Sequence, residues 1–336
     1  MPQRSDAGAA SASAHADVRN ADLAEAAASL RTGGLVAFPT ETVYGLGADS
    51  TQPEAVARIF EAKRRPRFNP LIAHVAEPET ARAHAAFDSR ADALAAAFWP
   101  GPLTLVLPRT PGCGVAELAS AGLPTLAVRV PGHPVAQRLL HALARPVVAP
   151  SANASGQLSP TTAEHVRHSL GARVDMILDG GPCTVGVEST ILDLTRTPAV
   201  ILRHGGISRE ALTGVLGEVA EGPAAAAAQP SAPGQLASHY APVRPLRLNA
   251  RTVWSGEGLL AFGADEPAGA AVARNLSPAG DLREAAANLF AHLHALDSAG
   301  VAGIAVVPVP EHGLGAAIND RLRRAAAPRP ASSGGG

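Results

Sequence analysis

Apolar residues recur in two patterns along the first two thirds of the chain. Leu23, Ala27 and Leu30 stand at helical spacing and predict a helix over 20–31, and Val56, Ile59 and Phe60 predict another over 51–63. Further helices are expected over 88–98, 134–143, 161–170 and 208–217. Short apolar runs predict strands at 35–38, 71–75, 103–107, 125–130, 147–149, 174–178, 188–194 and 200–203. This mixture predicts an α/β fold, a sheet covered by helices.

The composition shifts over residues 222–235, and this shift divides the chain. Residues 218–244 are rich in proline, glycine and alanine and are predicted to link two units, 17–217 and 245–327. In the second unit, apolar runs at 258–262 and 303–307 predict strands, and the patterns over 281–296 and 314–325 predict helices. We therefore expect a smaller α/β unit there. Residues 1–16 and 328–336 are expected to be disordered.

Charge and cysteine content exclude several classes of protein. The net charge of −1 gives no general attraction to nucleic acid or membranes. The two cysteines, Cys113 and Cys183, form no zinc-ligand spacing, and no metal-binding residues are predicted. We expect neither a signal peptide nor a membrane-spanning segment, because no suitable apolar run is found in the sequence. A cytoplasmic location is expected.

One lysine stands among 27 arginines. This residue, Lys63, begins the run KRRPRFNP, which places four cations within five residues. Cations at the end of a helix are stabilising in any case. A compact ammonium beside forked guanidinium groups also suits the phosphates of a nucleotide. Both explanations stay open at this point.

Three other segments place polar side chains next to predicted strands. The turn after residue 38 contains Thr42 and two glycines, in the position where open α/β sheets bind ligands. Ser151 and Asn153 follow the run at 147–149; extended backbone would direct both to one face, although serine and asparagine also form turns. Arg129 and Arg203 lie within or at the end of apolar strands, where each needs a partner or a ligand.

Taken together, these segments resemble the YrdC-like threonylcarbamoyl-AMP synthase family. The resemblance covers about residues 33–206. It rests on FPTETVYGLGADS at 38–50, KRRPRFNPLIAHV at 63–75, FWPGPLTLVL at 98–107, LAVRVPGHP at 126–134, PSANASG at 150–156, GVESTILDL at 186–194 and LRHGGIS at 202–208. SHYAP at 238–242, followed by a small unit, resembles the two-domain branch of this family.

The resemblance implies a fold and a reaction. The fold would be a twisted mixed sheet with helices around a concave basic groove, plus a smaller Rossmann-like C-terminal domain. The enzyme would be a nucleotidyltransferase that joins ATP, L-threonine and bicarbonate into threonylcarbamoyl-AMP and releases pyrophosphate, with Mg²⁺ on the triphosphate. Its product would pass to tRNA threonylcarbamoyl transferase proteins. Whether the chain contacts tRNA directly is left open.

The resemblance also assigns residues. Lys63 and Arg65 would be catalytic. The residues expected to bind ATP are Lys63, Arg65, Asn69, Thr125, Asn153, Thr161, Arg203 and Tyr240. Those expected to surround threonine are Thr42, His74, Arg129, Ser151 and Ser189, with Arg129 on the carboxylate. Tyr240 would close over the nucleotide, which would make the linker a lid.

Two other functions compete with this one. YrdC-like domains also occur in carbamoyltransferases, which usually sit on much longer chains with further motifs. Alternatively, a basic groove could bind RNA, although the 3% aromatic content offers few residues for base stacking.

Overall fold

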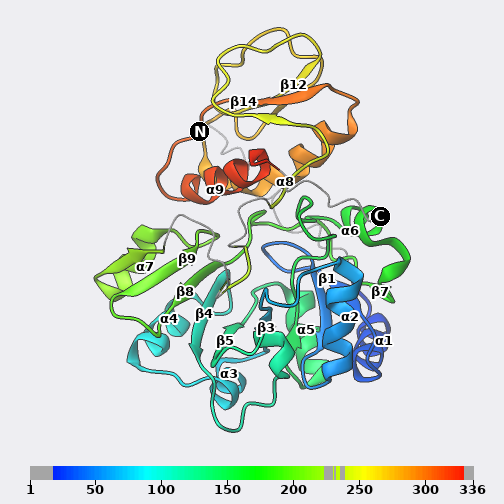
Figure 1. The fold of residues 1–336 in the computed structure, drawn as a ribbon, viewed down its shortest axis with the longest axis vertical. Coiled ribbons are helices and arrows are strands. Elements are labelled where there is room, and N and C mark those ends of the chain that lie inside the picture. Colours follow the sequence, from blue (N-terminus) through cyan, green and yellow to red (C-terminus); the bar gives the residue numbers. More distant parts are fainter. Residues whose placement is uncertain (1–17, 223–229, 231, 235–238, 329–336) are drawn as a thin grey trace, which may run out of the picture.

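The computed structural model describes residues 18–222, 230, 232–234 and 239–328, which form two α/β units (Figure 1). In Figure 1 the larger, N-terminal unit is blue to green, and the C-terminal unit is yellow to red. The segments expected to be disordered, 1–16 and 328–336, lie outside the described residues except for Pro328. The alanine run at 224–228 also lies outside them.

The N-terminal unit contains seven α-helices and ten strands within the described residues. Its helices are α1 (Asn20–Arg31), α2 (Pro53–Lys63), α3 (Pro78–His84), α4 (Ser89–Phe98), α5 (Pro134–Leu143), α6 (Ala163–Leu170) and α7 (Arg209–Leu216). Its strands are β1 (Val36–Phe38), β2 (Gly45–Asp49), β3 (Ile72–His74), β4 (Leu103–Pro108), β5 (Thr125–Arg129), β6 (Val147–Val148), β7 (Met176–Ile177), β8 (Thr190–Asp193), β9 (Ala199–Arg203) and β10 (Val219–Glu221). Every strand and helix predicted for this unit is present, with shifted ends in several cases.

The ten strands form one mixed sheet, as predicted. Their order is β10-β9-β8-β4-β5-β3-β6-β2-β1-β7. The sheet contains parallel pairs, such as β3 with β5, and antiparallel pairs, such as β4 with β5. Strand β2 was not predicted because its two glycines disfavour a strand, yet it is buried between β1 and β6. Strand β10 extends the sheet from residues that the composition assigned to the linker.

Helices cover both faces of this sheet. On β1, Val36 and Phe38 pack into one apolar cluster with α1 and α5, while Ala37 packs into another with α2. Alternation of this kind is what a strand buried on both faces requires. A third cluster joins α4 and α7 to β4, β5 and β8. The described helices include none that is both long enough and apolar enough to cross a membrane.

The C-terminal unit is a parallel sheet with two long helices. Strands β11 (Leu246–Arg247), β12 (Glu257–Ala261), β13 (Ala273–Asn275) and β14 (Gly303–Val306) pair in the order β11-β14-β12-β13, all parallel. Helices α8 (Leu282–Ser298) and α9 (Gly315–Ala326) pack between this sheet and the N-terminal unit (Figure 1). Asp281 caps α8 by accepting hydrogen bonds from two backbone N–H groups. The all-parallel sheet agrees with a Rossmann-like unit.

The two units touch through buried contacts. Arg321 of α9 forms an ion pair with Glu188 at a nitrogen–oxygen distance of 2.7 Å. Gly186 has φ +74°, and a Cβ atom placed there would lie 2.3 Å from the Ala286 oxygen of α8. His165 of α6 is half-buried and stacks on His294 of α8, with ring centroids 3.9 Å apart. Helix α8 therefore covers the face of α6 that carries His165.

Candidate active site

A cavity opens where the N-terminal sheet meets Pro233, Gly234, His239 and Tyr240. Its walls come from residues far apart in sequence: Thr40, Thr42, Val43, Arg65, Ile72, His74, Arg129, Ala149, Pro150, Ser151, Glu188, Ser189, Arg203, Pro233, Gly234, His239 and Tyr240. Three arginines and one glutamate give this cavity its charge. It is therefore a basic hollow, as expected of an anion-binding groove.

All five residues expected to surround threonine line this cavity. Thr42 lies on the turn after β1, and His74 and Arg129 are the last residues of β3 and β5. Ser151 follows β6, and Ser189 directly precedes β8. Of the residues expected to bind ATP, Arg65, Arg203 and Tyr240 line it as well. Lys63, Asn69, Thr125, Asn153 and Thr161 do not form its wall.

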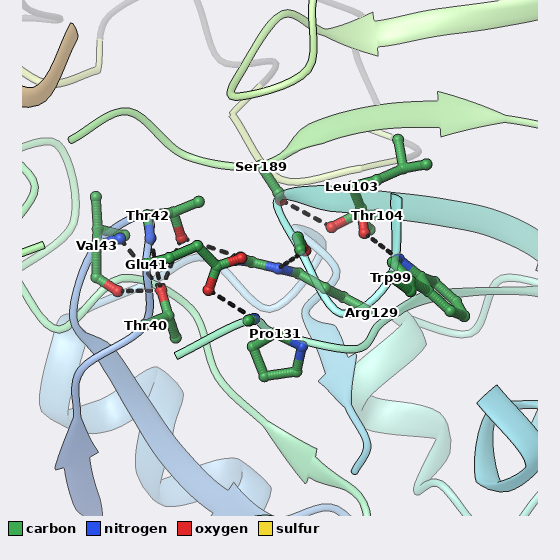
Figure 2. A network of polar contacts seen from close by, with 12 residues as sticks. Thr40, Glu41, Thr42, Val43, Trp99, Leu103, Thr104, Arg129, Pro131 and Ser189 are labelled. Atoms are coloured by element: carbon green, nitrogen blue, oxygen red, sulfur yellow. Dashed lines mark hydrogen bonds and ion pairs between the residues drawn. The ribbon is translucent and has the colours of Figure 1, made fainter. Parts of the chain in front are cut away.

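Arg129 is buried and held on three sides (Figure 2). Its Nη2 atom lies 2.6 Å from Glu41 Oε1, its Nη1 donates to Thr42 Oγ1 at 3.0 Å, and its Nε donates to the Gly101 oxygen at 3.1 Å. These contacts use three of its five N–H groups. One N–H on each terminal nitrogen has no further protein partner among the described residues. These two N–H groups, one on each terminal nitrogen, can bind the two oxygens of a carboxylate together.

His74 and Ser189 supply uncharged polar groups. Burial, reinforced by the charge of Arg129, lowers the pKa of His74 to about 3, so the imidazole is neutral at pH 7. Ser189 Oγ lies 2.7 Å from Thr104 Oγ1 (Figure 2) and also accepts a hydrogen bond from Arg203. These groups can orient a ligand without adding charge.

Arg65 and Arg203 bring two further cations to the wall. Arg203 donates to the Ser189 oxygen at 2.9 and 3.1 Å, and Arg65 donates to the Pro70 oxygen at 3.0 Å. Burial lowers the pKa of Arg65 to about 10, so it stays charged at pH 7. Both guanidinium groups are tethered mainly to neutral carbonyls. Their charge therefore remains available to an anionic ligand.

Lys63 lies behind the cavity wall. Its ammonium donates to the Ser151 oxygen at 2.5 Å and to the Asn153 oxygen. Burial, followed by Arg65 and Arg173, lowers the pKa of Lys63. The lone lysine thus fixes the 151–153 segment. Direct contact with phosphate stays a prediction.

Residues 151–156 form a turn, so Ser151 and Asn153 do not share a face. The extended-backbone expectation was wrong because the amide of Asn153 donates within the turn, to the Ala154 and Gln157 oxygens. Ser151 lines the cavity, whereas Asn153 is buried beneath it. In the described part of the chain, the Asn153 Oδ1 atom has no hydrogen-bond partner.

Asn69 is fully buried, and both polar atoms of its side chain lack a partner among the residues that the structure describes. Such groups are rare in native proteins and often mark a binding function. Thr161 is also buried and contacts His165 Nδ1, 3.4 Å from its hydroxyl. Thr125 begins β5, at the opposite end of that strand from Arg129. The structure therefore separates Thr125 from the cavity wall.

Tyr240 closes one side of the cavity from the C-terminal half. It is buried with φ +61°, an unfavourable conformation for a residue with a bulky side chain. Its ring lies 5.7 Å from that of Phe290 on α8. Gly234 approaches it closely: a Cβ atom there would lie 3.1 Å from Tyr240 Oη and 2.8 Å from Arg203 Cδ.

Replacing Gly234 with alanine is expected to destabilise the protein by about 1–2 kcal/mol, because φ is +86° and the new methyl group would press on Arg203. Urea unfolding measures this change. Gly214→Ala is the matched control, since Gly214 is exposed in α7 with open space around its Cα. The control should be neutral or slightly stabilising. Equal stability of the Gly234→Ala and parent proteins would contradict the close packing.

Several cavity residues were missed by sequence reasoning. Thr40 accepts hydrogen bonds from the N–H groups of Thr42 and Val43 and so shapes the turn. Glu41 neutralises Arg129, and Glu188 lies in the wall itself. The sequence offered only a weak signal, namely polar residues interrupting an apolar strand near position 188. Ion pairing across the fold cannot be read from a single sequence.

Comparisons with known proteins agree with this geometry. The family model described as "Telomere recombination" matches residues 28–205, and the one described as "Threonylcarbamoyl-AMP synthase, C-terminal domain" matches residues 207–327. Threonylcarbamoyl-AMP synthase of Pyrococcus abyssi is 42% identical over 320 residues, covering 89% of this chain and 92% of the relative. That of Bacillus subtilis is 40% identical, covering 91% and 93%.

A solved structure is similar over both units. The crystal structure of P. abyssi Sua5 complexed with L-threonine superposes with a TM-score of 0.85 at 40% identity, covering 90% of this chain and 94% of that one. The resemblance seen in the sequence is thus confirmed. On the combined evidence of its two matched domains and its full-length relatives, the chain belongs to the threonylcarbamoyl-AMP synthase family.

Proposed function

We propose that this protein synthesises threonylcarbamoyl-AMP from ATP, L-threonine and bicarbonate, as a nucleotidyltransferase. One observation carries the proposal. Five residues expected to surround threonine, one of them Arg129, come from five separate segments and line a single cavity together with two further arginines, Arg65 and Arg203. A relative of similar architecture has been solved with L-threonine. The cavity therefore offers both a threonine site and the positive charge that a triphosphate needs.

The residues divide into two sets in this proposal. Arg129 takes the threonine carboxylate, with Thr42, His74, Ser151 and Ser189 around the remaining polar groups. Arg65, Arg203 and Tyr240 hold the nucleotide from the wall, and the Asn69 side chain and the Asn153 Oδ1 atom, which lack partners among the described residues, are assigned to it as well. We place Lys63 in the nucleotide set because its ammonium donates hydrogen bonds to the backbone oxygens of Ser151 and Asn153. Thr125 and Thr161 are the weakest members, because they reach no part of the cavity wall and, unlike Asn69 and Asn153, have no buried side-chain polar atom that lacks a partner among the described residues.

The reaction follows from this placement. The amine of threonine combines with bicarbonate to form a carbamate and water. A carbamate oxygen then attacks the α-phosphorus of ATP, the bond to the β-phosphate oxygen breaks, and pyrophosphate leaves. Such a step depends on positioning and charge neutralisation more than on a protein nucleophile. Mg²⁺ enters with ATP as part of the substrate and neutralises phosphate charge.

The wider setting is also proposed. The product would be consumed by tRNA threonylcarbamoyl transferase proteins in the cytoplasm. An activated acyl adenylate requires an acceptor, and an adenosine amine in tRNA is the acceptor that this chemistry would serve.

Pyrophosphate release from the purified protein tests the proposal. With ATP, Mg²⁺ and bicarbonate, release is expected only when L-threonine is added, and mass spectrometry should detect threonylcarbamoyl-AMP. Omitting bicarbonate is the control for simple ATP hydrolysis. Release that depends on carbamoyl phosphate instead of threonine would favour the carbamoyltransferase alternative. No release under either condition would overturn the enzymatic proposal and direct attention to RNA binding.

A further inference from the structure

Arg321 is a buried cation that the function described above does not use. It lies on α9 of the C-terminal unit, and its side chain is 0% exposed. Its Nε donates to Glu188 Oε2 at 2.7 Å, its Nη1 to Asp320 Oδ2 at 2.6 Å and its Nη2 to the His204 oxygen at 2.9 Å. Two of these three partners belong to the N-terminal unit. Arg321 therefore crosses the interface between the units.

Glu188, the main partner of Arg321, forms part of the cavity wall. Its Oε1 accepts a hydrogen bond from Ser159 at 2.5 Å. Burial alone would raise the pKa of Glu188, but Arg321 and then Arg203 outweigh burial and hold that pKa at about 2. Glu188 is thus a carboxylate at pH 7. A negative charge faces the same hollow that is proposed to receive a triphosphate.

The arrangement of charges explains why this carboxylate is tolerated there. With Arg321 in place, the negative charge of Glu188 is compensated from outside the cavity. Without Arg321, the next cation acting on Glu188 is Arg203. Arg203 would then be drawn from its contacts with Ser189, and its charge would no longer be available to phosphate. A buried, uncompensated carboxylate would also repel the nucleotide.

Arg321 also faces a second cavity residue. Its guanidinium carbon lies 5.0 Å from the centroid of the Tyr240 ring, within the range of cation–π contacts. The Tyr240 ring also packs near Phe290 of α8, and the backbone N–H of His239 donates to the Arg324 oxygen of α9. The C-terminal unit therefore holds Tyr240 at the cavity through both of its helices.

We propose that Arg321 is a positioning residue of the nucleotide site: it neutralises Glu188 at the cavity wall and holds the ring of Tyr240 in place. This gives the C-terminal unit a defined part in binding ATP, although Arg321 itself need not touch the substrate. The inference rests on the proposed function, because it assigns Arg321 to the same ATP site.

The first test replaces the charge of Arg321. Arg321→Gln is expected to raise the KM for ATP by at least about tenfold, equivalent to ~1.4 kcal/mol, while the KM for L-threonine changes less. Glu188→Gln alone should lower the KM for ATP, because it removes a negative charge from the wall. The double variant should return the KM for ATP to within about threefold of Glu188→Gln. Failure of this rescue would overturn the charge-neutralising role.

The second test separates this role from simple structural support. Arg247 and Glu257 form an arginine–glutamate pair with two contacts, at 2.5 and 3.0 Å, inside the C-terminal unit and away from the cavity. Arg247→Gln should lower the melting temperature without changing the KM for ATP. A KM increase in Arg247→Gln as large as that in Arg321→Gln would mean that general destabilisation explains both.

Arg321→Lys keeps the proposal testable if the glutamine variant does not fold. Lysine preserves a positive charge beside Glu188 but cannot reach all three partners of the guanidinium group. We expect its KM for ATP to rise only about threefold. A rise as large as tenfold in a folded Arg321→Lys protein would contradict the importance of charge. Threonine-dependent pyrophosphate release by the parent protein shows separately whether the proposed function holds.

Discussion

Replacing Arg129 with lysine is expected to raise the KM for L-threonine at least about a hundredfold and to change the KM for ATP less than about threefold. Lysine keeps a positive charge beside Glu41. It lacks the guanidinium group of Arg129, in which each terminal nitrogen has one N–H left for the substrate carboxylate. Hydrogen bonds to charged groups contribute ~1.5–3 kcal/mol each, and a hundredfold change corresponds to ~2.7 kcal/mol. Steady-state pyrophosphate release, with each substrate varied in turn, measures both constants.

Two further variants define what this result means. Arg145→Lys is the matched control, because Arg145 contacts the buried carboxylate of Asp49 at 2.8 Å outside the cavity. It should leave both KM values unchanged. Arg129→Ala should unfold more easily, by ~3–5 kcal/mol, since Glu41 would keep a buried charge without its cation. If Arg129→Lys leaves the KM for threonine unchanged, Arg129 serves only to compensate Glu41.

Replacing Lys63 with methionine is expected to lower kcat/KM at least about a hundredfold for both substrates. Methionine preserves the apolar stem but leaves the Ser151 and Asn153 oxygens without the ammonium that holds them. A buried polar group left unsatisfied costs ~1–3 kcal/mol. Because Ser151 belongs to the threonine set and Asn153 to the nucleotide set, loosening this turn should affect both sites together.

The pattern of the loss distinguishes two roles for Lys63. If Lys63 contacts phosphate directly, its replacement should raise the KM for ATP alone. If Lys63 positions the 151–153 turn, its replacement should raise both the KM for ATP and the KM for L-threonine. Arg67→Ala is the neighbouring control, since Arg67 is exposed and lines no part of the cavity. Lys63→Arg should not rescue the loss, because the larger planar group does not fit a site fully enclosed in the structure. Full activity of the methionine variant would refute both roles.

The sequence predicted the elements of the fold better than their pairing. Helices α1 and α5 begin and end at the predicted residues, because their apolar spacing and their glycine or proline boundaries are local signals. Strand β2 was missed, since glycines give no local preference for a strand and pairing with β1 and β6 decides the outcome. Tertiary contacts of this kind overrule propensity.

The candidate site shows the same division. Thr42, His74, Arg129, Ser151 and Ser189, which the resemblance assigned to threonine, line one cavity, and their binding of threonine stays a prediction. What could not be predicted is which groups those residues contact. The lone lysine suggested phosphate binding, yet in the structure its ammonium donates hydrogen bonds to two backbone oxygens. Glu41 and Glu188 were not singled out, because their roles arise from arginines 88 and 133 positions away.

The contact at Gly186 limits how this protein can be recombined. Because main chain meets main chain there, even a methyl group would collide with Ala286 and Ala287 of α8. A chimera that joins this N-terminal unit to the C-terminal unit of a relative would need small residues at both surfaces and an arginine to match Glu188. Exchange of whole units at the linker without these matches would yield proteins whose two units cannot dock. Engineering of this protein should therefore keep its N-terminal and C-terminal units together.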